Sequence, residues 1–372
     1  YSGGATCPSL LLEPSRSNLI PQSEYYNTDW DLTSASVTDN AVTSPEGVQN
    51  ASKLIPANGT GGNRSISKLY ASLTGLHTFS VFAKAGEYGY ISLRARNGPG
   101  SFAMFDLTNG LVHAANTNAQ MVSGSPKIED YGNGWYRCSI VFDPSGSATP
   151  GQLFLSYSAG ITGDETTAFS GDGTNGIYIW GSVFEAGSYA TSYIPTYGTS
   201  QTRAEDLTYK TNVTSLIGQT EGTMYVEFEF NTNNTDNFNR IFSLGDGTGS
   251  NRILIIAQNT EAFRFFVQSG GIISVDLITS TSVFGGKHKV AFGYKENDFV
   301  AYIDGVQVGA DTSGIVPITS NVYLGMHESN NNLALEGSVQ EALLFKTRLS
   351  NLDLAILTGA TTYETFDEMA LA

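Results

Sequence analysis

The stretch FVAYIDGVQV, residues 299–308, decides the fold class. Two runs rich in β-branched and aromatic residues flank the pair Asp304-Gly305, and an Asp-Gly pair readily takes the positive φ angles of a tight hairpin turn. Upstream, Met224, Val226 and Phe228 share one face of a strand pattern. The other face carries Tyr225, Glu227 and Glu229. Such alternation predicts antiparallel strands with one face on a core.

The first half of the chain carries the same kind of pattern. We expect strands, separated by Gly, Asn, Asp and Pro clusters, over residues 77–83, 91–95, 135–142, 153–157 and 177–184. Helical periodicity is confined to the end, where Ser350 or Asn351 would cap a short helix over residues 349–357. The sequence therefore predicts an all-β protein.

A turn-rich segment, residues 195–200, separates the two halves, and a new strand pattern starts only after Leu207. The length of 372 residues also suits two sandwiches better than one. We therefore predict two antiparallel β-sandwich (jelly-roll) domains in tandem, residues 1–203 and 204–372, with a short C-terminal helix.

Composition excludes several partners. The net charge of −16 and the absence of any basic run argue against nucleic acid, because phosphate binding needs clustered Lys and Arg. No apolar run is long enough to span a bilayer, so we expect no membrane insertion. Because the chain begins at Tyr1 rather than Met, we expect a processed product or a fragment.

Two cysteines, Cys7 and Cys138, are the only ones in the chain. They would form one disulfide in an oxidising compartment or remain a buried pair of thiols.

The N-terminal half resembles the carbohydrate-binding-module-like jelly rolls of phage tail proteins. The resemblance rests on short phrases in a fixed order: CPSLLLEP (7–14), FSVFAKAG (79–86), GNGWYRC (132–138), GDG (171–173), IYIWG (177–181), EAG (185–187), TSYIPT (191–196) and TRA (202–204). They extend over nearly all of residues 1–203.

The C-terminal half resembles a laminin-G-like, concanavalin A-like sandwich. The phrases that carry it are EGT (221–223), YIDGV (302–306) and GSVQEALLF (337–345). Together the two resemblances imply a phage fibre or spike, or a related bacterial surface protein. They imply an extracellular or virion-surface location and a homo-oligomer, most often a trimer.

We expect such a protein to bind a cell-surface or extracellular polysaccharide without cleaving it. Sugars offer flat C–H faces and a rim of hydroxyls, so a sugar site needs an aromatic platform and planar hydrogen-bonding groups. The period of two places Tyr88, Tyr90, Arg94 and Arg96 on one strand face. Further candidates are Trp30, Trp180 and His327. The alternative for each is an ordinary outer face or a core position.

Calcium is the cofactor to consider, because loop carboxylates can hold a hard cation. The candidates are Asp164, Glu165, Asp172, Asp246 and Asp304, and the alternative is that they are solvated turn carboxylates.

Two other functions compete with glycan binding. A glycosidase needs two carboxylates on one face, and Glu227 and Glu229 share one, although their surroundings do not match the usual arrangement. A polysaccharide lyase would need a base and a neutralising Arg-rich strand, which we do not find. The remaining alternative is a structural virion or filament component.

Overall fold

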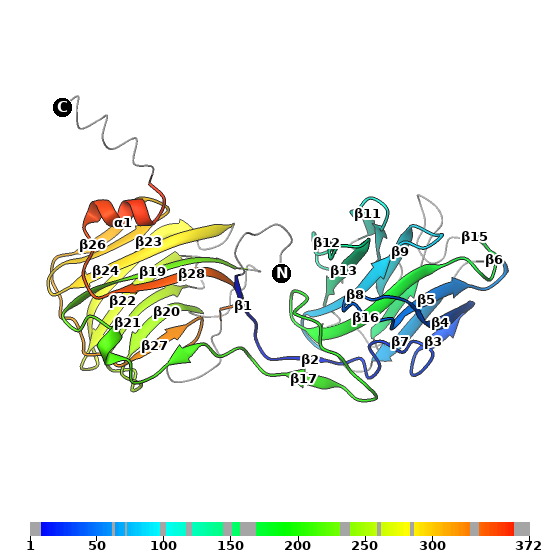
Figure 1. Cartoon of the computed structure of the whole chain (residues 1–372), viewed down its shortest axis with the longest axis horizontal. Helices are drawn as coiled ribbons and strands as arrows, with labels where there is room; N and C mark the ends of the chain where they lie inside the picture. The colour runs from blue at the N-terminus through cyan, green and yellow to red at the C-terminus, as the bar shows by residue number, and fades with distance from the viewer. Residues whose placement is uncertain are drawn as a thin grey trace, which may run out of the picture. The chain divides into compact units, whose positions relative to one another are not determined.

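The computed structural model describes residues 9–61, 64–70, 73–96, 102–116, 121–143, 151–156, 169–230, 239–258, 262–282, 286–327 and 335–360. These residues form antiparallel β-strands, one 3-10 turn (Thr214–Leu216) and one short α-helix (Figure 1). The contacts divide the chain into two compact units. The N-terminal unit comprises residues 15–203, and the C-terminal unit comprises the described parts of 1–14 and 204–372.

Two six-stranded sheets build the N-terminal unit. The first has the order β11 (Leu111–Asn116), β10 (Phe102–Asp106), β9 (Tyr90–Arg96), β14 (Gly151–Ser156), β7 (Ser65–Tyr70) and β3 (Asp31–Thr33). The second has the order β12 (Lys127–Asp130), β13 (Trp135–Phe142), β8 (His77–Lys84), β16 (Ile177–Ala186), β5 (Ala51–Pro56) and β4 (Ala35–Val42). Two small pairs complete the unit: β15 (Phe169–Gly171) with β6 (Gly59–Gly61), and β17 (Gln201–Arg203) with β2 (Arg16–Asn18).

The core of this unit lies between its two sheets. Phe79 and Val81 from β8 meet Ile91 and Leu93 from β9 in one buried cluster. Because side chains alternate along a strand, the residues between them belong to the outer faces of the two sheets. The expected sandwich fold is confirmed.

Two further six-stranded sheets build the C-terminal unit. One has the order β1 (Leu10–Leu12), β28 (Gly337–Phe345), β19 (Glu221–Phe230), β24 (Lys287–Lys295), β25 (Phe299–Ile303) and β26 (Val306–Asp311). The other has the order β18 (Tyr209–Lys210), β27 (Asn321–Leu324), β20 (Asn239–Gly245), β21 (Arg252–Ala257), β22 (Ala262–Ser269) and β23 (Ile272–Ser282).

The predicted hairpin is confirmed as β25 and β26. Its turn residues Asp304 and Gly305 have φ angles of 48° and 85°, which an Asp-Gly pair tolerates well. Met224, Val226 and Phe228 of β19 enter the core, as the alternation predicts.

The predicted helix is α1 (Asn351–Leu357), with Ser350 as its N-cap. It contacts β24 and β25, and Leu354 packs there with Tyr225 and Tyr302 in a second apolar cluster. The burial of Tyr225, with Glu227 and Glu341 nearby, raises the pKa of its phenol to about 12. The outer face of this sheet is therefore partly apolar, because the helix covers it.

Strand β1 joins the C-terminal unit, although it comes from the first residues of the chain. It pairs with β28 through Leu10 opposite Val339 and Leu12 opposite Gly337, and Leu12 is part of the C-terminal core. The expected division placed residues 1–203 in one domain. Because all three residues of β1 are leucines, the strand has no alternation of polar and apolar residues that would indicate which sheet it joins.

Cys138 is buried in the N-terminal core, where burial raises the pKa of its thiol. Cys7 lies outside the described residues, so the expected disulfide is not tested. In the described part of the chain, no helix is long and apolar enough to cross a membrane.

Candidate functional site

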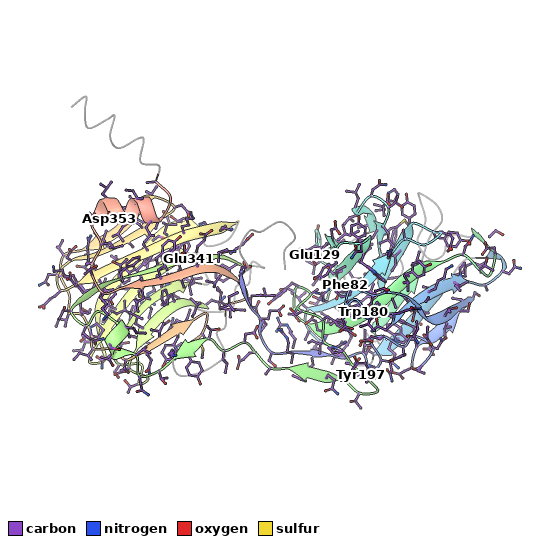
Figure 2. The ribbon with its side chains drawn as sticks, in the orientation of Figure 1. Phe82, Glu129, Trp180, Tyr197, Glu341 and Asp353 are labelled. Carbon is purple, nitrogen blue, oxygen red and sulfur yellow. The ribbon has the colours of Figure 1, made fainter. Side chains whose placement is uncertain are left out.

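One row of side chains crosses the outer face of the second N-terminal sheet. Glu129 on β12 lies opposite Arg137 on β13, Arg137 opposite Phe82 on β8, and Phe82 opposite Trp180 on β16. Figure 2 shows Glu129, Phe82 and Trp180 following one another across this sheet. The period of two places Phe82 outward, because Phe79 and Val81 on the same strand face the core.

Phe82 and Trp180 form the floor of an apolar cluster on this outer face, together with Trp135. The Phe82 and Trp180 ring centroids are 5.3 Å apart, and Trp180 lies 4.5 Å from Tyr193. A β-bulge after Trp180 makes room for these rings. Its residue Gly181 has a φ of 61°, and a Cβ there would lie 3.1 Å from the Phe82 ring and 3.3 Å from the Tyr193 ring.

Asn18 holds the segment that carries Tyr193 against the bulge. Its side-chain amide donates to the carbonyls of Ser182 and Ile194, at 3.1 and 2.9 Å. Its side-chain oxygen accepts from the backbone N–H groups of Ile20 and Phe184. All four bonds are buried, where a hydrogen bond is stronger than in water.

Tyr197 is an exposed ring with an anchored hydroxyl group. Its side chain is 65% exposed, yet its hydroxyl donates to Glu24 Oε1 at 3.2 Å. The same oxygen accepts from the Tyr193 hydroxyl at 2.7 Å, and Glu24 Oε2 accepts from Asn50 at 3.1 Å. Since Glu24 is buried, it fixes the orientation of a ring whose face remains in solvent.

Tyr131 lies at the other end of the cluster and is 48% exposed. Its ring meets Phe82 edge to face, with centroids 4.8 Å apart. It lies in a tight turn in which Asp130 accepts from the Gly132 N–H at 2.7 Å and Lys84 donates to the Asn133 carbonyl at 2.7 Å. The turn holds the ring in place.

We name the connected set Tyr131, Phe82, Trp180, Tyr193 and Tyr197 the aromatic arc. Its two ends are exposed and its middle is buried. Aromatic rings with an open face and a fixed position can stack on the apolar faces of sugar rings at little cost in conformational entropy. The arc therefore supplies two such platforms, Tyr131 and Tyr197, and the buried Glu24 anchors the second of them.

Three of the predicted site residues are buried, which corrects their expected role as contact residues. Trp30 is 6% exposed, donates from Nε1 to the Gln22 carbonyl at 2.9 Å and packs on Tyr26. Trp180 is 2% exposed and belongs to the floor of the arc. Arg94 is 5% exposed. None of these side chains presents an open surface to a sugar.

The other predicted residues do not assemble into one site. Tyr88 and Tyr90 are half-buried; Tyr88 packs against the N-terminal core and Tyr90 meets His113 with centroids 5.3 Å apart. His327 is half-buried in the C-terminal unit, and residues 328–334 beside it lie outside the described chain. The side chain of Arg96 also lies outside the described residues.

Sequence reasoning missed both exposed ends of the arc. A signal was present, because Tyr131 precedes the turn Gly132-Asn133-Gly134 and Tyr197 precedes Gly198. A large aromatic residue in a glycine-rich turn has little access to a core and is a candidate for ligand contact.

The calcium candidates within the described chain accept hydrogen bonds from their own turns. Asp172 accepts from the N–H groups of Thr174 and Asn175, both at 2.8 Å, and these bonds lower its pKa. Asp246 accepts from the Thr248 N–H and from the Asn251 side-chain amide, both at 2.8 Å.

Asp304 accepts from the Lys289 N–H at 2.8 Å and contacts His288 Nδ1 at 2.7 Å. Asp164 and Glu165 lie outside the described residues. Among the residues that the structure describes, no three His, Cys, Asp or Glu side chains are grouped to hold a metal ion.

The carboxylate pair considered for a glycosidase is engaged in cross-strand pairing. Glu227 lies within 3.5 Å of Lys287 Nζ and 3.8 Å of Lys289 Nζ, and Glu229 lies opposite Lys287. Ion pairs across antiparallel strands are ordinary features of a solvated sheet face. This arrangement gives no sign of the separated acid and base that glycoside hydrolysis needs.

A search of curated proteins found no match to this chain. Among solved structures, the CBM40 module of the Ruminococcus gnavus IT-sialidase is 18% identical, with a TM-score of 0.34, covering 38% of this chain and 85% of the module. A leech intramolecular trans-sialidase is 19% identical, with a TM-score of 0.33, covering 39% of this chain and 24% of that one. A SAP-like pentraxin from Limulus polyphemus is 11% identical, with a TM-score of 0.31, covering 36% and 68%.

The C-terminal unit has a family match of its own. Residues 206–355 match the family described as the concanavalin A-like lectin/glucanases superfamily, in agreement with the two-sheet fold of this unit.

Proposed function

We propose that this chain is a non-catalytic carbohydrate-binding protein, and that the aromatic arc of the N-terminal unit binds the glycan. The observation that carries the proposal is Tyr197, whose ring is two-thirds exposed while a buried carboxylate holds its hydroxyl. An exposed aromatic side chain fixed in this way loses little conformational freedom on binding. Tyr131 would supply a second platform, and a chain-like polysaccharide could occupy both.

The biological setting follows from the sequence resemblance. We propose a receptor-binding or adhesion role in a phage fibre or spike, or in a related bacterial surface protein, acting outside the cell or on the virion surface. A homo-oligomer, with a trimer favoured, would display several arcs at once. Multivalent display raises the overall affinity without any new contact at a single site.

A glycan array on the full chain tests the proposal, with Tyr197→Ala and Tyr131→Ala as test variants. Tyr209→Ala is the matched control, because Tyr209 is a similarly exposed tyrosine in the C-terminal unit. Loss of a central aromatic contact costs about 2 kcal/mol, roughly a thirtyfold loss of affinity. We expect that loss for Tyr197→Ala and wild-type binding for Tyr209→Ala.

Two outcomes would overturn the proposal. Silence of the wild-type protein on the whole array would remove the proposed function. Wild-type binding by both arc variants, with loss in Tyr209→Ala, would move the site to the C-terminal unit.

A further inference from the structure

Arg137, a cation in contact with the aromatic arc, is held inside the protein. Arg137 is buried, and its guanidinium lies 5.3 Å from the centre of the Phe82 ring. Its Nη2 donates to Ser80 Oγ at 3.0 Å. Its charge also acts on the buried carboxylate of Glu185, where it lowers the pKa against the larger effect of burial. Arg137 is therefore not available to a sugar carboxylate or sulfate.

Of the two lysines near the arc, Lys84 contacts the turn that carries Tyr131 and keeps its charge, and Lys53 is paired with a carboxylate. Lys84 donates to the Asn133 carbonyl at 2.7 Å. Lys53 lies 2.8 Å from the carboxylate of Glu87 and 5.8 Å from the centre of the Tyr178 ring. On the edge strand β12, Lys127 lies opposite Ser139 and therefore outside the row of the arc, in which Glu129 lies opposite Arg137.

The Tyr197 end of the arc carries negative charge. Glu24 and Glu46 are joined through Asn50, whose Nδ2 lies 3.1 Å from Glu24 Oε2 and 3.5 Å from Glu46 Oε2. Partial burial raises the pKa of the Tyr197 phenol, and both carboxylates raise it further. A ligand stacked on Tyr197 would therefore lie in a negative potential.

We infer that the aromatic arc selects uncharged glycans and rejects those that carry carboxylate or sulfate groups. The inference rests on the proposed function and names its ligand class. An anionic sugar stacked on Tyr197 would face Glu24 and Glu46, and like-charge juxtaposition is costly in an interface. A neutral sugar would pay no such cost and would bind by stacking and hydroxyl hydrogen bonds.

The test compares matched neutral and anionic probes on the full chain: galactose-terminated oligosaccharides with and without a terminal sialic acid, and a neutral glucan with its sulfated form. We expect each neutral probe to bind at least roughly tenfold more tightly than its charged partner. Binding of the neutral probes should change little between roughly 50 and 500 mM salt, because screening acts only on charges.

A charge reversal sharpens the test. Glu46→Lys places a cation beside Tyr197 and should reduce the discrimination against anionic probes, while neutral binding stays within roughly twofold because stacking does not depend on the charge. Glu341→Lys makes the same change in net charge in the C-terminal unit, where Glu341 is exposed, and should leave the discrimination unchanged.

The two failures are distinguishable. Equal or tighter binding of the anionic probes, weakened by salt and abolished by Tyr197→Ala, would overturn the ligand class and keep the proposed site. Absence of binding to either kind of probe would overturn the proposed function itself. Equal effects of Glu46→Lys and Glu341→Lys would show that the charges at Tyr197 do not set the selectivity.

Discussion

Substitution of Gly181 by alanine should damage both the stability of the N-terminal unit and its aromatic arc. Gly181 forms the β-bulge after Trp180 and has a φ of 61°. An added Cβ would lie 3.1 Å from Phe82 Cδ2 and 3.3 Å from Tyr193 Cε2. Both contacts are tight, so the two rings must shift by a few tenths of an ångström or the bulge must change its backbone.

The expected loss of stability has a conformational part and a packing part. An alanine in the left-handed region costs about 1–2 kcal/mol, and the reduced freedom of the unfolded chain offsets about 0.4–1 kcal/mol of that cost. Forcing extra volume into a packed cluster adds about 1–3 kcal/mol. We therefore expect Gly181→Ala to lower the free energy of unfolding of this unit by about 1–5 kcal/mol.

Gly124→Ala is the matched control within the same unit. Its φ is 73°, but an added Cβ would meet nothing within 4 Å, so only the conformational part remains, about 1 kcal/mol or less. Calorimetry should show a Tm lowered by roughly 2–4 °C for each kcal/mol in a unit of this size.

The two variants should also differ in their affinity for the glycan. Gly181→Ala should weaken the glycan identified on the array, because it displaces the ring next to the Tyr193–Glu24–Tyr197 hydrogen bonds, whereas Gly124→Ala should not. Equal losses of stability in the two variants, with unchanged glycan binding, would refute the reasoning that the bulge positions the arc.

Three further predictions concern burial elsewhere. Leu12→Ala should destabilise the C-terminal unit by about 2–5 kcal/mol and leave the N-terminal transition in calorimetry unchanged, because Leu12 is buried in the C-terminal core; a shift of the N-terminal transition alone would contradict this. Burial raises the pKa of Glu185 above its ordinary value of 4.5, although two hydrogen bonds from Thr191 and the charges of Arg137 and Arg16 partly counter it. The contribution of Glu185 to stability is therefore full below pH 4.5 and declines as the pH rises through the raised pKa. Urea unfolding at several pH values should show that the wild type loses stability relative to Glu185→Gln as the pH rises above 4.5. A difference in stability that stays constant with pH would contradict a raised pKa at Glu185. Cys138 should react with a thiol reagent only after unfolding, as its burial requires, and peptide mapping of the labelled native protein should find it unmodified.

Local patterns in the sequence predicted most of the fold. Alternation placed Met224, Val226 and Phe228 in a core, Asp304-Gly305 at a hairpin turn, and Ser350 at a helix cap. Each of these features depends on neighbours a few residues away. Strand β1 depends instead on pairing with residues more than three hundred positions later, which no local pattern records.

The site was harder to predict than the fold. A period of two tells which face of a strand a side chain occupies, but not which loops cover that face. It placed Tyr90 and Arg94 on the outer face of β9, yet Arg94 is buried there. The exposed ends of the arc, Tyr131 and Tyr197, lie in turns where periodicity carries no information. Their role depends on tertiary contacts with Phe82 and Glu24.

The most direct test of the central claim is a crystal structure of the full chain with the oligosaccharide that binds most tightly on the array. We expect an uncharged sugar ring stacked on Tyr197, with the oligosaccharide extending toward Tyr131, the other exposed ring of the arc. An oligosaccharide bound instead at Tyr90, or anywhere in the C-terminal unit, with the aromatic arc unoccupied, would contradict it.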